Sequence, residues 1–151
     1  MTWEDARRWR GALGNRRLVL TNGVFDLVHP GHVDVLLAAR GEGDALMVAV
    51  NSDDSVRRLK GPTRPVRGEL DRLYVIAALE MVDVVVLFQQ DTPLELIRMI
   101  EPDILVKGGD YSEGTVIGAS EVRARGGKVV IVPLTPGHST TAIVEKLRGV
   151  R

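Results

Sequence analysis

Five short runs of apolar residues, none interrupted by polar alternation, restrict the fold of this chain more than any other feature. A strand with one wet face alternates apolar and polar residues, whereas a strand buried on both faces is apolar throughout. The runs are therefore typical of a parallel sheet that is covered on both sides. They span residues 18–20, 46–50, 84–88, 104–106 and 129–132.

Patterns with helical spacing lie between these runs. Apolar residues three and four positions apart predict one helix after the first run and another after the second. The predicted inner faces are Val33, Leu36 and Leu37 in the former helix, and Leu70, Leu73 and Ala77 in the latter. Residues 92–95 resemble a capping box with Pro93 at the first helical position, which predicts a helix before the fourth run.

Two more helices complete the alternation. Residues 118–125 show a weaker helical pattern that Gly126 and Gly127 end, and Ser139 is placed to cap a last helix. The apolar residues of that last helix are Ile143, Val144 and Leu147. Residues 1–14 are predicted to be an N-terminal helical extension, and its docking side chains are Trp3, Trp9 and Leu13.

The alternation of strands and helices predicts an α/β fold: a Rossmann-like, doubly wound, five-stranded parallel sheet with helices on both faces. We expect residues 1–151 to form a single domain. Sheets of this kind bind ligands at the carboxyl ends of their strands. Residues that directly follow an apolar run are therefore the candidates for chemistry.

Charge and composition exclude several classes of protein. Lys and Arg total 20 and Asp and Glu total 20, so the net charge is zero, which disfavours a nucleic-acid-binding protein. With no Cys, the chain has neither disulfides nor thiolate metal ligands. Its first residues lack the apolar segment of a secretory signal, and no apolar run is long enough to cross a membrane. We expect a cytoplasmic protein.

The strongest motif is TNGVFDLVHPGH, residues 21–32, at the end of the first run. Pro30 is placed to begin a helix, so His29 and His32 can face the same way at its N-terminus. Gly31 lets an anion approach the backbone there. Two imidazoles beside a helix N-terminus suit a phosphate group. The alternatives are two incidental surface histidines, or a metal pair, for which no third ligand is evident.

A basic segment follows the second run. Lys60 and Arg64 are expected in a Gly- and Pro-containing loop within residues 50–66, where mobile cationic side chains could close over phosphates. Taken alone, the segment also fits a solvated basic turn.

Two further segments follow the fourth and fifth runs. Lys107 precedes a Gly-Gly pair and Asp110, an arrangement that suits an anion and a sugar hydroxyl but also an ordinary turn. Three hydroxyl residues, Ser139, Thr140 and Thr141, stand at a helix start, where they can cap the helix and bind phosphate oxygens. All four polar segments are expected at one edge of the sheet. His138 has no assigned role.

These strings resemble the HxGH nucleotidyltransferase superfamily, which includes cytidylyltransferases and pantetheine-phosphate adenylyltransferase. The resemblance runs from about Leu18 to Leu147 and includes NSDxSVxxLKGxxRP, VKGGDY and the STT triplet. It is greatest to the adenylyltransferase domain of the bifunctional heptose enzymes. It implies transfer of AMP from ATP to D-glycero-D-manno-heptose 1-phosphate, giving ADP-heptose and pyrophosphate.

The resemblance also assigns roles to residues. Catalytic roles fall on His29, His32 and Lys60. Nucleotide binding falls on Thr21, Asn22, Gly23, Phe25, Gly31, Lys107, Ser139, Thr140 and Thr141. Substrate binding falls on Asp26, Asn51, Arg64, Gly108, Gly109 and Asp110. Mg²⁺ is expected to be held mainly by nucleotide phosphates, with no protein metal site. A homodimer and a separate upstream sugar kinase are expected as well.

No activated nucleophile is evident, so we expect direct attack by the acceptor phosphate on the α-phosphorus rather than a covalent intermediate. Two alternatives stay open. One is a glycerol-3-phosphate cytidylyltransferase-like enzyme that uses CTP, which Leu134 disfavours because such enzymes carry Arg in an RTxGIST-like string. The other is a non-catalytic nucleotide-binding module. A nucleic-acid-binding α/β domain is disfavoured further by the few aromatic residues.

Overall fold

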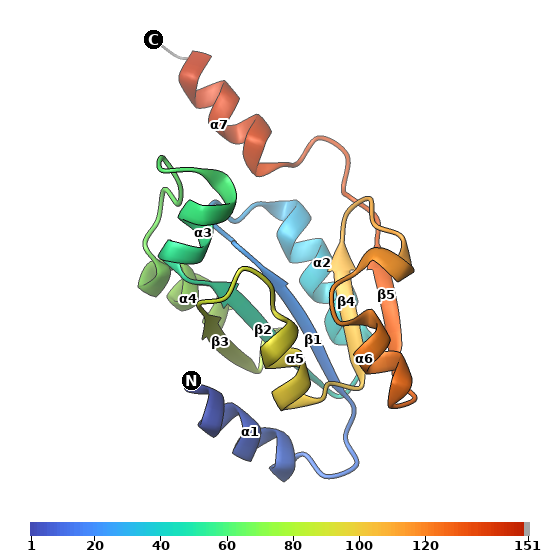
Figure 1. The fold of residues 1–151 in the computed structure, drawn as a ribbon. Coiled ribbons are helices and arrows are strands. Elements are labelled where there is room, and N and C mark those ends of the chain that lie inside the picture. The colour runs from blue at the N-terminus through green and yellow to red at the C-terminus, as the bar shows by residue number, and fades with distance from the viewer. Residues whose placement is uncertain (150–151) are drawn as a thin grey trace.

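The computed structural model describes residues 1–149; Val150 and Arg151 lie outside the described residues. Five parallel strands form one sheet in the order β3-β2-β1-β4-β5 (Figure 1). Each predicted apolar run is a strand, and four of the five strands extend beyond the run by one to three residues. The strands are β1 (Leu18–Gly23), β2 (Ala45–Asn51), β3 (Val84–Phe88), β4 (Ile104–Gly108) and β5 (Lys128–Val132).

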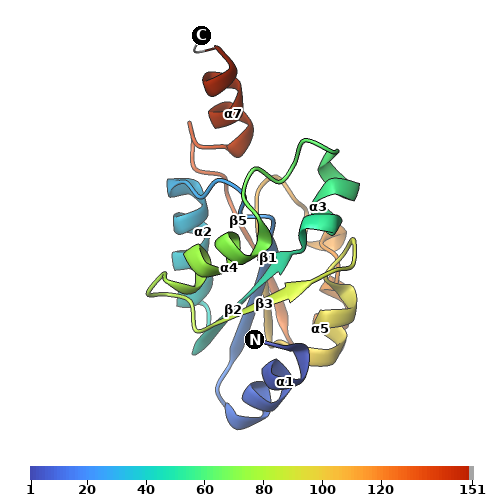
Figure 2. The ribbon, with the colours of Figure 1, turned by 90° about the vertical axis from the view of Figure 1, so that its left-hand side faces the viewer.

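Helices cover both faces of the sheet, which confirms the predicted Rossmann-like, doubly wound α/β fold (Figures 1 and 2). The helices are α1 (Trp3–Ala12), α2 (Pro30–Gly41), α3 (Asp53–Lys60), α4 (Glu69–Ala77), α5 (Leu94–Ile100), α6 (Ala119–Ala124) and α7 (Thr140–Gly149), with a 3₁₀ turn, η1, at Glu113–Thr115. The last helix, α7, projects beyond the carboxyl ends of the strands (Figures 1 and 2).

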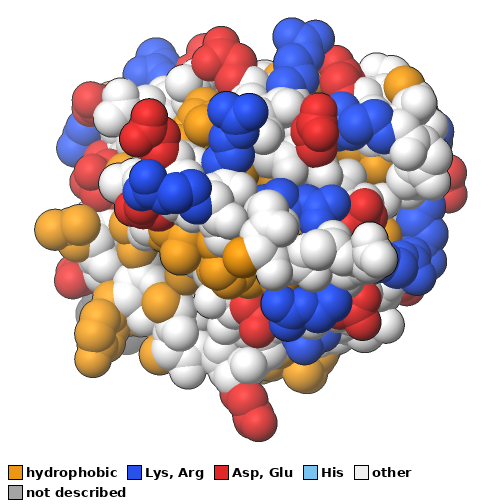
Figure 3. Space-filling view, turned by 90° about the horizontal axis from the view of Figure 1, so that it is seen from below, with side chains coloured by type: hydrophobic (Ala, Val, Ile, Leu, Met, Phe, Trp, Pro, Cys, Tyr) orange, Lys and Arg blue, Asp and Glu red, His pale blue; other side chains and the backbone are white. Residues whose placement is uncertain are grey.

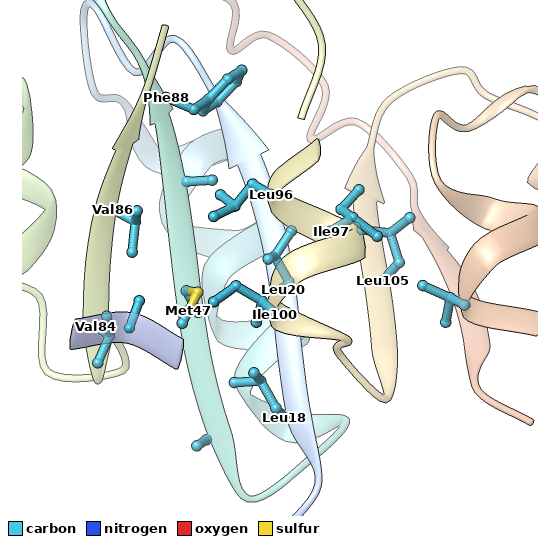
Figure 4. Close-up of a cluster of buried hydrophobic side chains, with 14 of the residues drawn as sticks. Leu18, Leu20, Met47, Val84, Val86, Phe88, Leu96, Ile97, Ile100 and Leu105 are labelled. Atoms are coloured by element: carbon cyan, nitrogen blue, oxygen red, sulfur yellow. The ribbon is translucent and has the colours of Figure 1, made fainter. Parts of the chain in front are cut away.

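Successive strand residues point to opposite faces, so the chain builds two hydrophobic cores. Leu18 and Leu20 pack with α1, α5 and α6 in one core, whereas Val19 packs with α2 and α4 in the other. Figure 4 shows the first core, in which Leu96 and Ile100 of α5 lie over β1 and β2. Each fully buried aliphatic side chain of this kind stabilises the fold by about 1.5–3 kcal/mol.

Two predicted inner faces are partly wrong. In α2, Leu36 is fully buried, but Leu37 is 53% exposed. In α4, Leu70 is 76% exposed and Ala77 is exposed, whereas Ile76 is fully buried. The face of α4 was misplaced because a fully buried arginine, Arg72, lies on it, and apolar periodicity cannot indicate a buried charge.

Two local predictions, one of a loop and one of a helix cap, are also wrong. Lys60 was expected in a loop, but residues 53–60 form α3, whose N-cap Ser52 accepts a hydrogen bond from the Ser55 N–H at 3.2 Å. Of its eight residues only Val56 and Leu59 are apolar, so the segment has the composition of a polar loop. The capping box at residues 92–95 does not form, because the N-cap of α5 is Pro93, which has no side-chain cap.

The predicted start of α7 and the predicted end of α6 are confirmed. Ser139 Oγ accepts a hydrogen bond from the Ala142 N–H at 3.0 Å, as its capping role requires. Beyond α6, Gly126 has φ +81°, and a Cβ on Gly127 would lie 2.4 Å from the Asp103 carbonyl oxygen. No other residue fits at position 127 without moving the backbone.

The N-terminal helix docks as expected. Leu13 is buried, and Trp3 and Trp9 pack against the first core. The Trp3 indole N–H also donates to the Leu87 carbonyl of the edge strand β3 at 2.8 Å. This bond gives a partner to a carbonyl that an edge strand would otherwise leave to solvent.

The end of the molecule opposite α7 has a mixed surface. Seen from below, positive and negative side chains are interspersed there, and no histidine is visible (Figure 3). Among residues 1–149, no helix combines the length and apolarity needed to cross a membrane.

Docking of α1 can be tested by changing Trp3. Trp3→Phe keeps most of the packing but loses the hydrogen bond, so we expect the free energy of unfolding to fall by about 0.5–1.5 kcal/mol. Trp3→Ala should cost about 2–4 kcal/mol because packing is lost as well. Urea unfolding measures both. Tyr74→Ala, at a 78% exposed residue, is the control, with an expected change within about 0.5 kcal/mol. Equal stability of Trp3→Ala and the control would refute docking.

Candidate active site

A hollow of about 630 Å³ lies at the carboxyl edge of the sheet. It receives residues that follow each of the five strands, including His29 after β1, Lys60 after β2 and Pro93 after β3. From β1 the chain winds outward to β2 and β3, and later through β4 to β5 on the other side of β1. The hollow therefore lies at the point where the winding reverses, which is where such sheets bind ligands.

Nearly all the site residues predicted from the sequence line this hollow. They are Thr21, Asn22, Gly23, Phe25, Asp26, His29, Gly31, His32, Asn51, Lys60, Arg64, Lys107, Gly108, Ser139, Thr140 and Thr141. The two exceptions are Gly109 and Asp110, which are not part of its lining. Gly109 has φ +120° and turns the chain away after β4, leaving Asp110 exposed.

The two histidines of the motif cap helix α2 together. His29 is the N-cap, and its Nδ1 accepts a hydrogen bond from the Gly31 N–H at 3.1 Å. His32 Nδ1 accepts from the His29 N–H at 3.2 Å, which completes a reciprocal capping box. Pro30 occupies the first helical position, as predicted. The rings lie side by side, with centroids 3.9 Å apart.

These hydrogen bonds define the proton positions on both rings. Because each Nδ1 accepts a hydrogen bond, the neutral form of each imidazole carries its proton on Nε2. Both Nε2–H groups are then free of the capping bonds, and both residues line the hollow. The pair can thus present two hydrogen-bond donors to one ligand.

The same surroundings keep the rings neutral. Burial, with a further contribution from the neighbouring His29, lowers the pKa of His32 to about 4. Burial and the nearby His138 also lower the pKa of His29. Near neutral pH both rings are therefore neutral, and the pair can bind a ligand as hydrogen-bond donors rather than as two cations.

Gly31 is required for a reason that differs from the expected one. A Cβ at position 31 would lie 2.8 Å from His29 Cε1, so any side chain would displace that ring. The Gly31 N–H is also occupied by His29, and it is not open to an anion as the sequence suggested. The helix N-terminus therefore offers its imidazoles rather than a bare backbone.

The Phe25 ring lies next to the histidine pair. Its ring centroid lies 5.4 Å from that of His32, and its backbone has φ +51°. Positive φ is unfavourable for an aromatic residue. Gly23 makes room for the ring, because a Cβ there would lie 3.0 Å from Phe25 Cε2. Gly23 and Phe25 thus form the part of the hollow next to His32.

Two lysines converge on the hollow. Burial lowers the pKa of Lys107, and the positive charge of Lys60 lowers it further. The Lys107 ammonium also lies 5.5 Å from the centroid of the Tyr111 ring. An anionic ligand between the two ammonium groups would relieve their repulsion, so this part of the hollow is suited to phosphates.

Asp26 and Arg64 bind each other. Arg64 Nε donates to Asp26 Oδ2 at 2.7 Å, and the Asp26 carboxylate also accepts the N–H groups of Val66 and Arg67. Burial raises the pKa of Asp26, but the hydrogen bonds from Arg67, Val66 and Arg64 outweigh it, and the net pKa is lowered. Asp26 was predicted to bind substrate; in the structure it fastens the loop of residues 64–67 to the site.

A buried arginine that sequence reasoning missed holds this region together. Arg72 is fully buried and donates to the carbonyls of Val24 and Arg67 and to the Asp53 carboxylate. It therefore connects the loop after β1, the loop before α4 and the start of α3. The only sequence signal was a charge on the apolar face of a predicted helix.

Asn51 is buried beside the hollow. Its Nδ2 donates to Ser55 Oγ at 3.0 Å, and that hydroxyl donates to the Gln90 carbonyl at 2.9 Å. These bonds tie the ends of β2 and β3 together. The Asn51 side chain, which was predicted to bind substrate, is therefore already engaged in a hydrogen bond within the protein.

The hollow has an apolar side that the sequence did not reveal. It is formed after β4 and β5 by Tyr111, Val116, Ile117 and Leu134. His138, to which the sequence assigned no role, also lines the hollow. Within residues 1–149, no group of three His, Asp or Glu side chains is arranged to hold a metal ion.

Comparison with known proteins shows the family of this chain. A family model described as cytidylyltransferase-like matches residues 20–146. The bifunctional protein HldE of Gluconobacter oxydans (strain 621H) is 61% identical over 133 residues, which cover 88% of this chain and 28% of that protein. HldE of Acidiphilium cryptum (strain JF-5) is 55% identical over 146 residues, covering 97% and 30%. The chain spans less than a third of the length of these relatives.

Two solved structures share the fold. The lipopolysaccharide core biosynthesis protein of Thermoplasma volcanium GSS1 has a TM-score of 0.65 and 31% identity, covering 80% of this chain and 98% of that one. A pantoate-beta-alanine ligase from Francisella tularensis has a TM-score of 0.61 and covers 97% of this chain and 75% of that one. At 13% identity, the ligase is alike in fold alone.

The depressed pKa of His32 predicts how stability depends on pH. A histidine in the unfolded chain titrates near pH 6.5, so between pH 6.5 and about 4 the unfolded state takes up a proton that the folded state refuses. We therefore expect the free energy of unfolding to decrease as the pH is lowered through this window. His29 contributes in the same direction, whereas Asp26, with its lowered pKa, loses its contribution only below about pH 3.9.

Urea unfolding at pH steps from 7.5 to 4.5 measures the effect. His32→Gln should show a shallower loss of stability than the unchanged protein, because one of the two depressed histidines is gone. Parallel curves for the two proteins would show that His32 titrates normally in the folded state.

Proposed function

This chain belongs to the cytidylyltransferase-like family of nucleotidyltransferases, and on that premise we propose that it transfers AMP from ATP to D-glycero-D-manno-heptose 1-phosphate. The products are ADP-heptose and pyrophosphate. The observation that carries the proposal is the pair of Nε2–H donors of His29 and His32, in one hollow with Lys60 and the 139–141 hydroxyls. This set of groups suits a polyphosphate at its α-phosphorus.

The proposed reaction is a direct displacement. An oxygen of the acceptor phosphate forms a bond to the α-phosphorus of ATP, while the bond from that phosphorus to the bridging oxygen of pyrophosphate breaks. His29 and His32 donate hydrogen bonds from Nε2 to the α-phosphoryl oxygens, on which negative charge builds. Because both rings are neutral and fixed by the capping box, they need no rearrangement as the charge develops.

The lysines supply the positive charge of the proposed site. Lys60 and Lys107 face the phosphates, and Ser139, Thr140 and Thr141 contribute hydroxyl donors at the start of α7. Mg²⁺ is proposed to be held by the nucleotide's own phosphates, which fits a hollow whose lining carboxylates, Asp26 and Asp91, are already bonded to Arg64 and Arg58. Bound there, the ion would neutralise phosphate charge.

The asymmetry of the hollow supports an orientation for the two substrates. The apolar side chains after β4 and β5, among them Tyr111 and Ile117, suit the face of a nucleobase. The polar side after β2 and β3, with Lys60 and Arg64, suits a phosphorylated sugar. The heptose itself rests on the resemblance of NSDxSVxxLKGxxRP and VKGGDY to heptose-phosphate adenylyltransferases. A separate sugar kinase would supply the acceptor.

A nucleotide-by-acceptor panel tests the proposed function. Pyrophosphate release is measured with ATP, CTP and GTP against both anomers of D-glycero-D-manno-heptose 1-phosphate and against glycerol 3-phosphate. We expect the highest kcat/KM with ATP and a heptose 1-phosphate. Preference for CTP and glycerol 3-phosphate would identify a cytidylyltransferase instead. Nucleotide binding without turnover on any acceptor would indicate a non-catalytic module.

The histidine pair can be tested by itself once a substrate pair is known. His32→Ala removes one donor to the α-phosphoryl group, so kcat should fall by roughly 10²–10⁴-fold. Circular dichroism checks that the variant stays folded. Leu37→Ala is the matched control, because it changes a 53% exposed residue of the same helix and should leave kcat unaltered. Normal kcat in His32→Ala would remove the pair from the mechanism.

A further inference from the structure

His138 lies near the histidine pair although it is 106 positions from His32 in the sequence. Its ring is nearly parallel to that of His29, with an interplanar angle of 19° and centroids 6.2 Å apart. Its Cβ would be 3.4 Å from a Cβ placed on Gly31. All three histidines of the chain therefore gather at one point of the hollow.

The scaffold makes no use of the His138 imidazole. The residue is exposed, and within residues 1–149 its ring forms no hydrogen bond to another group. His138 lines the hollow near His29, and the first hydroxyl residue of the 139–141 triplet follows it directly in the chain. A polyphosphate that contacts both the histidine pair and these hydroxyls would lie close to this ring.

A single turn holds His138 at this position. Its N–H donates to the Thr135 carbonyl at 3.3 Å, and Gly137 at φ +81° allows the chain to turn. Thr135 Oγ1 donates in turn to Asp34 Oδ2 of helix α2 at 2.8 Å. Helix α7 buries none of its residues, so this bond is an important anchor of the segment. Helix α2 thereby sets the positions of all three imidazoles.

We propose that His138 is a third imidazole of the phosphate site, which binds the β- or γ-phosphate of the nucleoside triphosphate and is positioned by the Thr135–Asp34 hydrogen bond. The inference rests on the proposed function, because it assumes that a triphosphate enters this hollow. It assigns the α-phosphate to His29 and His32 and the terminal phosphates to His138. The role is in binding the triphosphate, not in the displacement step.

Calorimetric binding without an acceptor tests this assignment. The probes are MgATP, inorganic tripolyphosphate and AMP, which lacks the terminal phosphates. His138→Phe keeps the ring and loses its N–H donors, so we expect MgATP and tripolyphosphate to bind about 10-fold or more weakly, while AMP binding changes less than about 2-fold. His138→Gln restores an N–H donor and should regain most of the affinity. With a substrate pair in hand, His138→Phe should raise the KM for ATP and leave kcat within a few-fold.

The positioning bond is tested by a double-mutant cycle. Thr135→Val removes the hydroxyl donor with little change of shape and should weaken MgATP binding by about 3–10-fold. In the His138→Phe background the same change should have no further effect, because the ring it positions no longer binds. Additive effects of the two changes would overturn the positioning role. Leu37→Ala is again the control on the surface of α2.

The results separate this inference from the proposed function. Unchanged MgATP binding by His138→Phe, or equal weakening of AMP, overturns the role of His138 even if the enzyme turns over. Binding that depends on His138 without turnover on any acceptor keeps the inference and rejects the transfer reaction. Failure of the unchanged protein to bind either MgATP or tripolyphosphate rejects both.

Discussion

The capping hydrogen bonds made by the side chains of His29 and His32 are the interaction on which the rest of the site depends. One pair of bonds begins helix α2, places the rings 3.9 Å apart and leaves both Nε2–H groups for a ligand. A helix N-terminus usually offers its free N–H groups to an anion. Here the imidazoles take up those groups and project the donor function further into the hollow. The position of the His29 ring therefore depends on Gly31, since a side chain there would displace His29.

Helix α2 also aligns the segments that follow β4 and β5. A Cβ on Gly108 would lie 2.7 Å from Val35 Cγ2, so β4 approaches α2 as closely as a glycine permits. The hydrogen bond from Thr135 to Asp34, the residue before Val35, fixes the segment after β5 to the same helix. Two segments far apart in sequence thus take their positions from one helix, and a shift of α2 would move the imidazoles and both of these segments together.

Sequence reasoning succeeded where a single segment contains the whole signal. The five apolar runs became the five strands because each run is apolar on both faces; the runs in β1, β2 and β4 are buried throughout, and those in the edge strands β3 and β5 are partly buried. It failed where a contact joins distant residues: Arg72 is buried by partners 5, 19 and 48 positions away, and this charge hid the inner face of α4. Helix α3 was missed because it buries little apolar surface. The position of His138 is set by Asp34, which no local pattern indicates.

The charges around the hollow divide into two groups with different uses. Asp26 pairs with Arg64 and Arg72 pairs with Asp53, and these ion pairs, together with hydrogen bonds to the backbone, fix loops. Burial lowers the pKa of Lys107, and the positive charge of Lys60 across the hollow lowers it further. An arriving polyphosphate would stabilise the charged form of Lys107, so the repulsion in the free protein becomes attraction for the ligand. A chain with no net charge can therefore still hold a strongly anionic substrate, because its acidic residues at the hollow are already bonded to arginine and backbone.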